Sequence, residues 1–228
     1  MSESDTSAMK GLYQQGYFTT RAGNDPKRQA AFVQDAALIR KYVQRGNLLD
    51  VGCSTGEFID ALQWQGDCYG MEISDFAAGE ARKRGVRFET HLGNAADFFD
   101  LVVFRGTIQH VDTPFLYMKQ ASVALKPGGY MFFLATPNAN SLYYKLWNTL
   151  PALDPKMNFF IPADHVLVNA LKNFGFDPVE TRHPYLESPY ASPWRDHWNF
   201  VLKCLGRDVR FPFWRNMMDV VVRKPQRA

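Results

Sequence analysis

Short apolar runs alternate with amphipathic stretches along most of this chain. The apolar runs predict strands at residues 48–51, 68–71, 86–89, 100–104 and 130–135. Amphipathic stretches between them predict helices at about 25–46, 56–65 and 75–84, with another starting at Thr113-Pro114. Because the strands lack strict polar alternation and helices separate them, the pattern predicts an α/β fold whose mostly parallel sheet is covered on both faces.

Capping residues and apolar spacing define several of these helices. Asp25-Pro26 reads as an N-cap followed by a first-turn proline, and Gly46 is expected to end that helix. In the helix after Thr113-Pro114, the side chains expected to face inward are Phe115, Met118 and Leu125. A further stripe, ending at Gly175, consists of Leu167, Ala170, Leu171 and Phe174.

The junction at residues 48–58 carries the first chemical signal. An apolar strand ends at Asp50-Val51, a turn containing Gly52 and Gly56 follows, and a helix then begins. Such a turn exposes backbone N–H groups and admits close approach of a ligand. Glu72 stands twenty positions after Gly52, at the end of the second strand, where a carboxylate can accept hydrogen bonds from both hydroxyls of a ribose. Together these features indicate a nucleoside cofactor.

These residues resemble the class I S-adenosylmethionine-dependent methyltransferases, of a bacterial-type branch that modifies small molecules and sugars. Residues 48–58 are similar to the first motif of that family, and Gly70–Glu72 to the second. Residues 93–95 are similar to the adenine-contacting loop, and residues 100–104 and 125–130 to the fourth strand and the turn into the fifth. The resemblance extends from about Tyr17 to Glu180. The family usually has glycine where Ser54 stands, and serine fits there if its backbone dihedrals are ordinary and its hydroxyl faces the ligand.

The resemblance implies a Rossmann-like sheet of seven strands with an antiparallel last strand at Met217–Val222. It also implies S-adenosyl-L-methionine as cofactor and S-adenosyl-L-homocysteine as product. The residues expected to bind this cofactor are Arg21, Asp50, Gly52, Cys53, Ser54, Gly56, Glu72, Ile73, Asn94, Ala95 and Arg105. No metal is expected.

Several of these residues admit two interpretations. Asp50 orients the glycine turn or the cofactor's amino group, or else is a buried structural hydrogen-bonding group. Asn94 stands where the family usually has aspartate, and its carbonyl could accept the bond from the adenine amino group. Arg21 could pair with the cofactor's carboxylate or be solvated.

Histidines supply the candidates for a general base. His110 lies just past the fourth strand, where the methyl group should sit, and it is the candidate catalytic residue, with a structural hydrogen-bonding role as the alternative. His165 is a second candidate. His183 and His197 have no partner nearby in the sequence that singles them out.

Two other function classes remain open. Residues 52–56 match G-x-S-x-G, the nucleophile elbow of α/β-hydrolases, which would make Ser54 a nucleophile. A hydrolase elbow normally follows several strands and a glycine-rich oxyanion loop, and neither precedes this turn. The other class is a non-catalytic protein that binds the cofactor and presents a surface to a partner.

The composition bears on the domain organisation, the cellular location and the partners to be expected. A chain of 228 residues with 46% hydrophobic content is expected to form one domain, residues 1–228, with an N-terminal arm at 1–24. Three cysteines in no ligand pattern indicate reduced thiols, and the polar start of the chain has no signal peptide, which predicts a cytoplasmic protein without a membrane span. A net charge of +3 without a basic stripe argues against nucleic acid.

Two long segments exceed the minimal scaffold, residues 138–164 and 184–214. Both are rich in aromatic residues, and the second contains a helix that begins at Ser192-Pro193 and ends at Gly206. Long connections in a compact domain often form binding walls or lids. We therefore expect them to enclose a small-molecule or glycan acceptor for in-line methyl transfer to oxygen or nitrogen. The oligomeric state cannot be predicted from the sequence.

Overall fold

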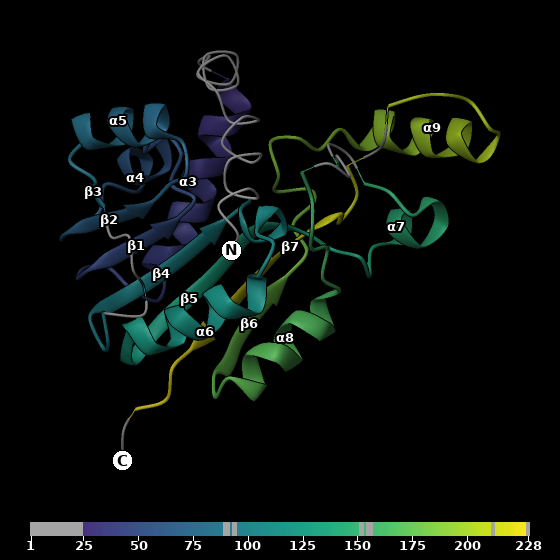
Figure 1. Ribbon diagram of the computed structural model, residues 1–228. Helices are drawn as coiled ribbons and strands as arrows, with labels where there is room; N and C mark the ends of the chain where they lie inside the picture. The colour runs from purple at the N-terminus through teal and green to yellow at the C-terminus, as the bar shows by residue number, and fades with distance from the viewer. Residues whose placement is uncertain are drawn as a thin grey trace.

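A seven-stranded sheet in the order β3-β2-β1-β4-β5-β7-β6 organises the computed structural model of the protein (Figure 1). The structure describes residues 25–88, 92, 95–150, 153, 157–210 and 213–226. The strands are β1 Leu48–Val51, β2 Cys68–Met71, β3 Arg87–Phe88, β4 Phe99–Arg105, β5 Leu125–Pro137, β6 Asp177–Arg182 and β7 Met217–Arg223. The first five strands pair in parallel, whereas β7 runs antiparallel to both β5 and β6. This confirms the predicted fold class and the antiparallel last strand.

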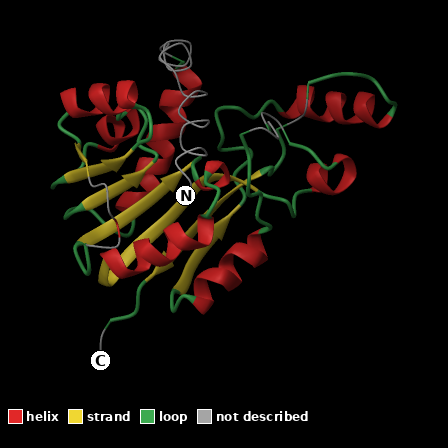
Figure 2. Cartoon of the chain, viewed as in Figure 1, coloured by secondary structure: helices red, strands yellow, loops and turns green. Residues whose placement is uncertain are grey.

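Helices cover both faces of the sheet, as Figure 2 shows. One face packs against α3 (Pro26–Arg40), α4 (Glu57–Leu62) and α5 (Asp75–Lys83), and the other against α6 (Pro114–Ala124) and α8 (Asp164–Asn173). A short helical turn, η2 (Ile108–His110), follows β4. Two further helices, α7 (Leu142–Trp147) and α9 (Pro193–Cys204), lie away from both layers (Figure 1).

The core consists of two apolar layers, one on each face of the sheet. Alternate residues of β4 serve the two layers, since Leu101 and Val103 pack on the α3 side and Val102 and Phe104 on the α6 side. Side chains of successive strand residues point to opposite faces, so a strand buried on both faces must be apolar throughout. That requirement explains why the sequence of β4 shows no alternation.

Three boundary or facing predictions were wrong. The first helix ends at Arg40, not Gly46, because Arg45 and Gly46 pair with Gln65 and lead the chain into β1. The fifth strand begins at Leu125, since Leu125 already pairs with Phe99 of β4. Phe115 is 46% exposed, although Met118 and Leu125 are buried as expected.

The carboxyl ends of β1, β2, β4 and β5 meet along one edge of the sheet. At this edge β5 is irregular where it pairs with β7, and Ala135 has a φ of 49°. Asp219 of β7 accepts a hydrogen bond from the Ala135 amide at 3.0 Å and one from Arg182 of β6 at 2.9 Å. One buried carboxylate thus ties three strands together beside the region where a ligand of such a sheet binds.

Candidate functional site

The turn between β1 and α4 leaves no room for a side chain at its first glycine. Gly52 has a φ of 80°, and a Cβ there would lie 2.5 Å from the Thr107 side chain. Gly56, with a φ of 82°, is the residue that caps α4. Glycine accepts positive φ without strain. The turn therefore brings backbone, rather than side chains, up to the carboxyl edge, as the sequence predicted.

Glu72 follows β2 directly, and its carboxylate is held by the backbone. Its Oε2 accepts from the Ser54 amide at 3.0 Å, and its Oε1 accepts from the Ser74 amide at 2.9 Å. Burial raises the pKa of Glu72, while these backbone hydrogen bonds lower it. Each carboxylate oxygen can accept a second hydrogen bond. The group is thus fixed in place with capacity for two hydroxyl donors.

Asp50 is a buried carboxylate at the end of β1. Burial raises the pKa of Asp50 to about 7, while Arg105 lowers it and Glu72 raises it further. Its Oδ1 has no hydrogen-bond partner among the described residues. A buried acceptor without a donor is costly, which marks a position that a bound donor can satisfy. The amino group of S-adenosylmethionine is a donor of this kind, so the residues at this edge fit the predicted cofactor.

Arg105 at the end of β4 is held by α3. Its Nε donates to Asp35 Oδ2 at 2.8 Å, and its guanidinium lies 4.3 Å from the ring centroid of Phe32. Burial raises the pKa of Asp35 to about 6, although Arg105 lowers it. Asp35 was not among the predicted site residues. The available signal was its position on the apolar face of the first helix, three residues after Phe32.

Ser54 does not meet the condition set for it from the sequence. Its φ is 52°, in the left-handed region, where the family's usual glycine is unstrained. The expectation of ordinary dihedrals was therefore wrong. The reason is that the Ser54 amide must point at Glu72, which constrains the backbone on both sides of the turn.

Of the other predicted cofactor residues, the structure describes Cys53, Ile73 and Ala95. Cys53 is buried, and it closes the space next to Gly70, where a Cβ would lie 2.5 Å from the Cys53 sulfur. Burial raises the pKa of this thiol, so it remains protonated near neutrality. Ile73 and Ala95 are half-buried. Arg21 and Asn94 lie outside the described residues, so their roles stay predictions.

His110 lies in η2, directly after β4, and has a defined orientation. Its Nδ1 is 2.6 Å from the Met157 carbonyl oxygen, and its Nε2 is 3.3 Å from Gln109 Nε2. A carbonyl only accepts, so Nδ1 carries the proton of the neutral ring and Nε2 keeps its lone pair. The segment around Met157 is held in turn, because the Phe159 amide donates to the Gln109 carbonyl at 2.8 Å.

A second histidine site was not singled out by the sequence. His183 Nε2 lies 2.9 Å from Asp164 Oδ2, and Asn140 Nδ2 donates to Asp164 Oδ1 at 2.9 Å. Partial burial raises the pKa of Asp164, but hydrogen bonds from His165, Asn140 and His183 outweigh it and bring the pKa to about 2. His183 and Asp164 are nineteen positions apart in the sequence, and they meet because β6 packs beside α8. The His165 side chain is exposed.

The long aromatic segments pack mainly on each other. Phe200 of α9 lies 5.8 Å from the Tyr143 ring, 5.9 Å from the Trp147 ring and 5.1 Å from the Trp214 ring, measured between centroids. Trp194 and Trp198 point the other way, into solvent. These two side chains therefore form no wall of an enclosed pocket in this structure. That the two segments enclose an acceptor stays a prediction.

Comparison with known proteins assigns the family. A family model described as a methyltransferase domain matches residues 22–181, which is well over half of the chain. The chain therefore belongs to this family, the class I S-adenosylmethionine-dependent methyltransferases, and S-adenosylmethionine is the family's cofactor. This confirms the resemblance and the predicted cofactor, and it replaces the hydrolase interpretation of Ser54.

Curated relatives share only part of their length with this chain. A protein named ubiquinone biosynthesis O-methyltransferase from Hydrogenovibrio crunogenus is 30% identical over 116 residues, covering 46% of this chain and 48% of the relative. A protein of the same name from Ruegeria pomeroyi is 25% identical over 166 residues, covering 64% of this chain and 66% of the relative. The chain thus spans about half of the first of these relatives.

Solved structures support the fold. A Burkholderia thailandensis 1,6-didemethyltoxoflavin-N1-methyltransferase, solved with bound 1,6-didemethyltoxoflavin and S-adenosylhomocysteine, has a TM-score of 0.64 at 14% identity, covering 99% of this chain and 91% of that one. A Thermotoga maritima protein described as an S-adenosylmethionine-dependent methyltransferase has a TM-score of 0.59 at 19% identity, covering 88% and 91%. At these identities the likeness concerns the fold alone.

In the described residues, no group of three or more His, Cys, Asp or Glu side chains is arranged to hold a metal ion. Within the same residues, every helix is too short or too polar to cross a bilayer.

Proposed function

We propose that this chain is an S-adenosylmethionine-dependent O-methyltransferase that modifies a hydroxyl of a small molecule. When bound, S-adenosylmethionine supplies a methyl group already activated by its positively charged sulfur. Glu72 accepts hydrogen bonds from the ribose hydroxyls, Asp50 accepts from the amino group, and the Gly52–Gly56 turn lets the backbone approach. These groups orient the donor, and fixed orientation is worth about 7–11 kcal/mol in a displacement of this type.

The orientation of His110 is the observation that carries the proposal of an oxygen acceptor. A hydroxyl must lose its proton as it attacks, whereas an amine that is already neutral needs no base. The Met157 carbonyl fixes the Nδ1–H tautomer, so Nε2, which lies 3.3 Å from Gln109 Nε2, is the ring nitrogen that takes that proton. His110 follows β4, next to the strand that carries the cofactor turn. The names of the curated relatives, which are O-methyltransferases, support the same choice.

A methyl-transfer assay tests this proposal directly. The chain is incubated with S-adenosylmethionine carrying a trideuterated methyl group and with three sets of acceptors: phenols, sugars and amines. We expect mass spectrometry to find the label on a phenolic oxygen. Label on sugar hydroxyls would move the acceptor to the glycan class, and label only on amines would contradict the role given to His110. Calorimetric titration with S-adenosylhomocysteine, run alongside, separates loss of cofactor binding from choice of the wrong acceptor.

A further inference from the structure

Helix α9 exposes a continuous apolar stripe. Trp194, Trp198, Val201 and Leu205 follow one another at spacings of four, three and four residues, which places them on one side of a helix. Their exposed fractions are 92%, 63%, 47% and 72%. We refer to these four residues as the α9 apolar face. Exposed apolar surface of this kind marks an interaction site when it is contiguous.

The opposite side of α9 is firmly attached to the protein. Phe200 packs among the rings of α7 and Trp214. Asp196 is buried and accepts hydrogen bonds from the Ser192 amide at 2.9 Å and the Tyr185 hydroxyl at 3.1 Å. The helix is therefore fixed in its orientation, and its apolar face is presented outward rather than exposed by fraying.

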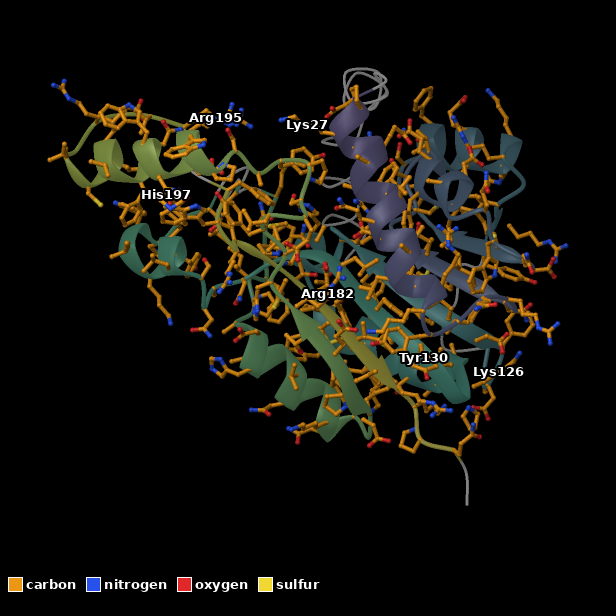
Figure 3. The ribbon with its side chains drawn as sticks, turned by 180° about the vertical axis from the view of Figure 1, so that it is seen from behind. Lys27, Lys126, Tyr130, Arg182, Arg195 and His197 are labelled. Atoms are coloured by element: carbon orange, nitrogen blue, oxygen red, sulfur yellow. The ribbon has the colours of Figure 1, made fainter. Side chains whose placement is uncertain are left out.

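The helix also lies where a large surface can reach it. In Figure 1, α9 is at the outer limit of the molecule, beyond α7 and away from α3, α4 and α5. Figure 3, seen from behind, places Arg195 and His197 on this same outlying helix. A flat partner can meet α9 without meeting the sheet.

The charged residues around the α9 apolar face indicate the kind of partner that fits it. Arg195 adjoins Trp194, and Arg207 and Arg210 follow Leu205, all of them exposed. In the fully described stretch 193–210, Asp208 is the one exposed acidic residue, because Asp196 is buried. Two copies of this surface would bring like charges together, whereas an anionic surface complements it. Tryptophan beside arginine on an amphipathic helix is the composition that binds at the boundary between lipid headgroups and acyl chains.

We propose that α9 lies on the surface of anionic lipid bilayers, with its apolar face inserted below the headgroups. The arginines contact lipid phosphates, and the helix does not cross the membrane, because its 12 residues are too few. This inference does not depend on the proposed O-methyltransferase activity, since it concerns a surface whose occupation can be measured without any acceptor.

Sedimentation with lipid vesicles tests the proposal on the full chain. We expect binding to phosphatidylcholine vesicles that contain phosphatidylglycerol, and at least about tenfold weaker binding to phosphatidylcholine alone, since each basic residue near an anionic surface contributes about fivefold. The double variant Trp194→Ser with Trp198→Ser should bind the anionic vesicles at least about tenfold less tightly. Bromine-labelled lipids should quench tryptophan fluorescence in the unsubstituted chain and much less in this variant.

A matched control removes exposed apolar side chains elsewhere. Val33 of α3 and Leu116 of α6 are exposed, so Val33→Ser with Leu116→Ser should leave vesicle binding unchanged. Melting curves establish that both double variants are folded. Equal binding to both vesicle types, equal loss in the control, or no binding at all would overturn the proposal. Sedimentation equilibrium that shows a dimer dependent on Trp194, without vesicle binding, would assign the face to a second copy instead.

Discussion

The two halves of the carboxyl edge are built differently. On the cofactor half, β1 and β2 are followed by short turns, and the backbone itself sets the positions of Gly52, Asp50 and Glu72. On the other half, β5, β7 and β6 are joined by long segments, and contacts between distant residues such as His110 and Met157 set the geometry. The geometry of the first half is therefore fixed by the backbone, whereas the second half can change with its side chains while the sheet stays the same.

The largest expected effect tests the cofactor half. Glu72→Ala should weaken binding of S-adenosylhomocysteine by about 10²–10⁴-fold, because two charge-assisted hydrogen bonds, each worth about 1.5–3 kcal/mol, are lost. Calorimetric titration measures the affinity. Glu80→Ala, which removes a half-buried carboxylate of α5 that pairs with Lys83, is the control and should bind as the unsubstituted chain does. An affinity for Glu72→Ala within about threefold of the original would remove Glu72 from the site.

The next effect belongs to the acceptor half. His110→Asn should lower the rate of methyl transfer by about 10²–10⁴-fold if His110 is the base, with cofactor affinity unchanged. The acid limb of the pH–rate profile should disappear in the same variant, since that limb reports protonation of the base. His165→Asn, at an exposed position, should leave both unaltered. A small rate loss with an unchanged pH profile would mean that His110 serves structure and that orientation alone drives transfer.

The contrast between the halves also explains what the sequence could predict. Local apolar patterns, turn glycines and a fixed spacing encode the strand–turn–helix at residues 48–58 and the position of Glu72. Both features could therefore be predicted from the sequence. The His183–Asp164 pair and the Asp35–Arg105 pair join elements far apart in the chain, and no local pattern encodes such contacts. The direction of Trp194 and Trp198 was missed for a related reason. A helix with apolar residues on two sides does not reveal which side the body covers.

A third prediction concerns the charge buried in the cofactor half. The pKa of Asp50 is raised to about 7, so the folded state retains a proton on this group at pH values where the unfolded chain has lost it. Its contribution therefore favours folding at low pH and is lost as the pH rises from about 4 to 7. Asp50→Asn should match the original stability near pH 4 and exceed it by about 2–4 kcal/mol at pH 8.

Denaturant unfolding without cofactor at the two pH values measures this difference. The same variant should bind the cofactor about tenfold or more weakly, because the charged acceptor for the amino group is gone. Stability differences that are equal at pH 4 and pH 8 would show that Asp50 does not titrate in this range. If Asp50→Asn is more stable than the original chain but binds the cofactor more weakly, the Asp50 carboxylate serves cofactor binding at a cost in stability.

The smallest expected effect concerns Ser54, the point where the cofactor half departs from its family's usual residue. Its φ of 52° places a side chain in the left-handed region, which costs a residue other than glycine about 1–2 kcal/mol. Ser54→Gly relieves this cost but adds freedom to the unfolded chain, so we expect a net gain of about 1 kcal/mol and a rise in melting temperature of about 2–4 °C. Cofactor affinity should be unchanged or slightly higher, since the amide that donates to Glu72 is kept.

Ser54→Ala is the matched control, because it removes the hydroxyl and retains the Cβ. If the alanine variant gains as much stability as the glycine variant, the hydroxyl rather than the backbone is the source of strain. If both variants lose cofactor affinity, the hydroxyl contacts the ligand.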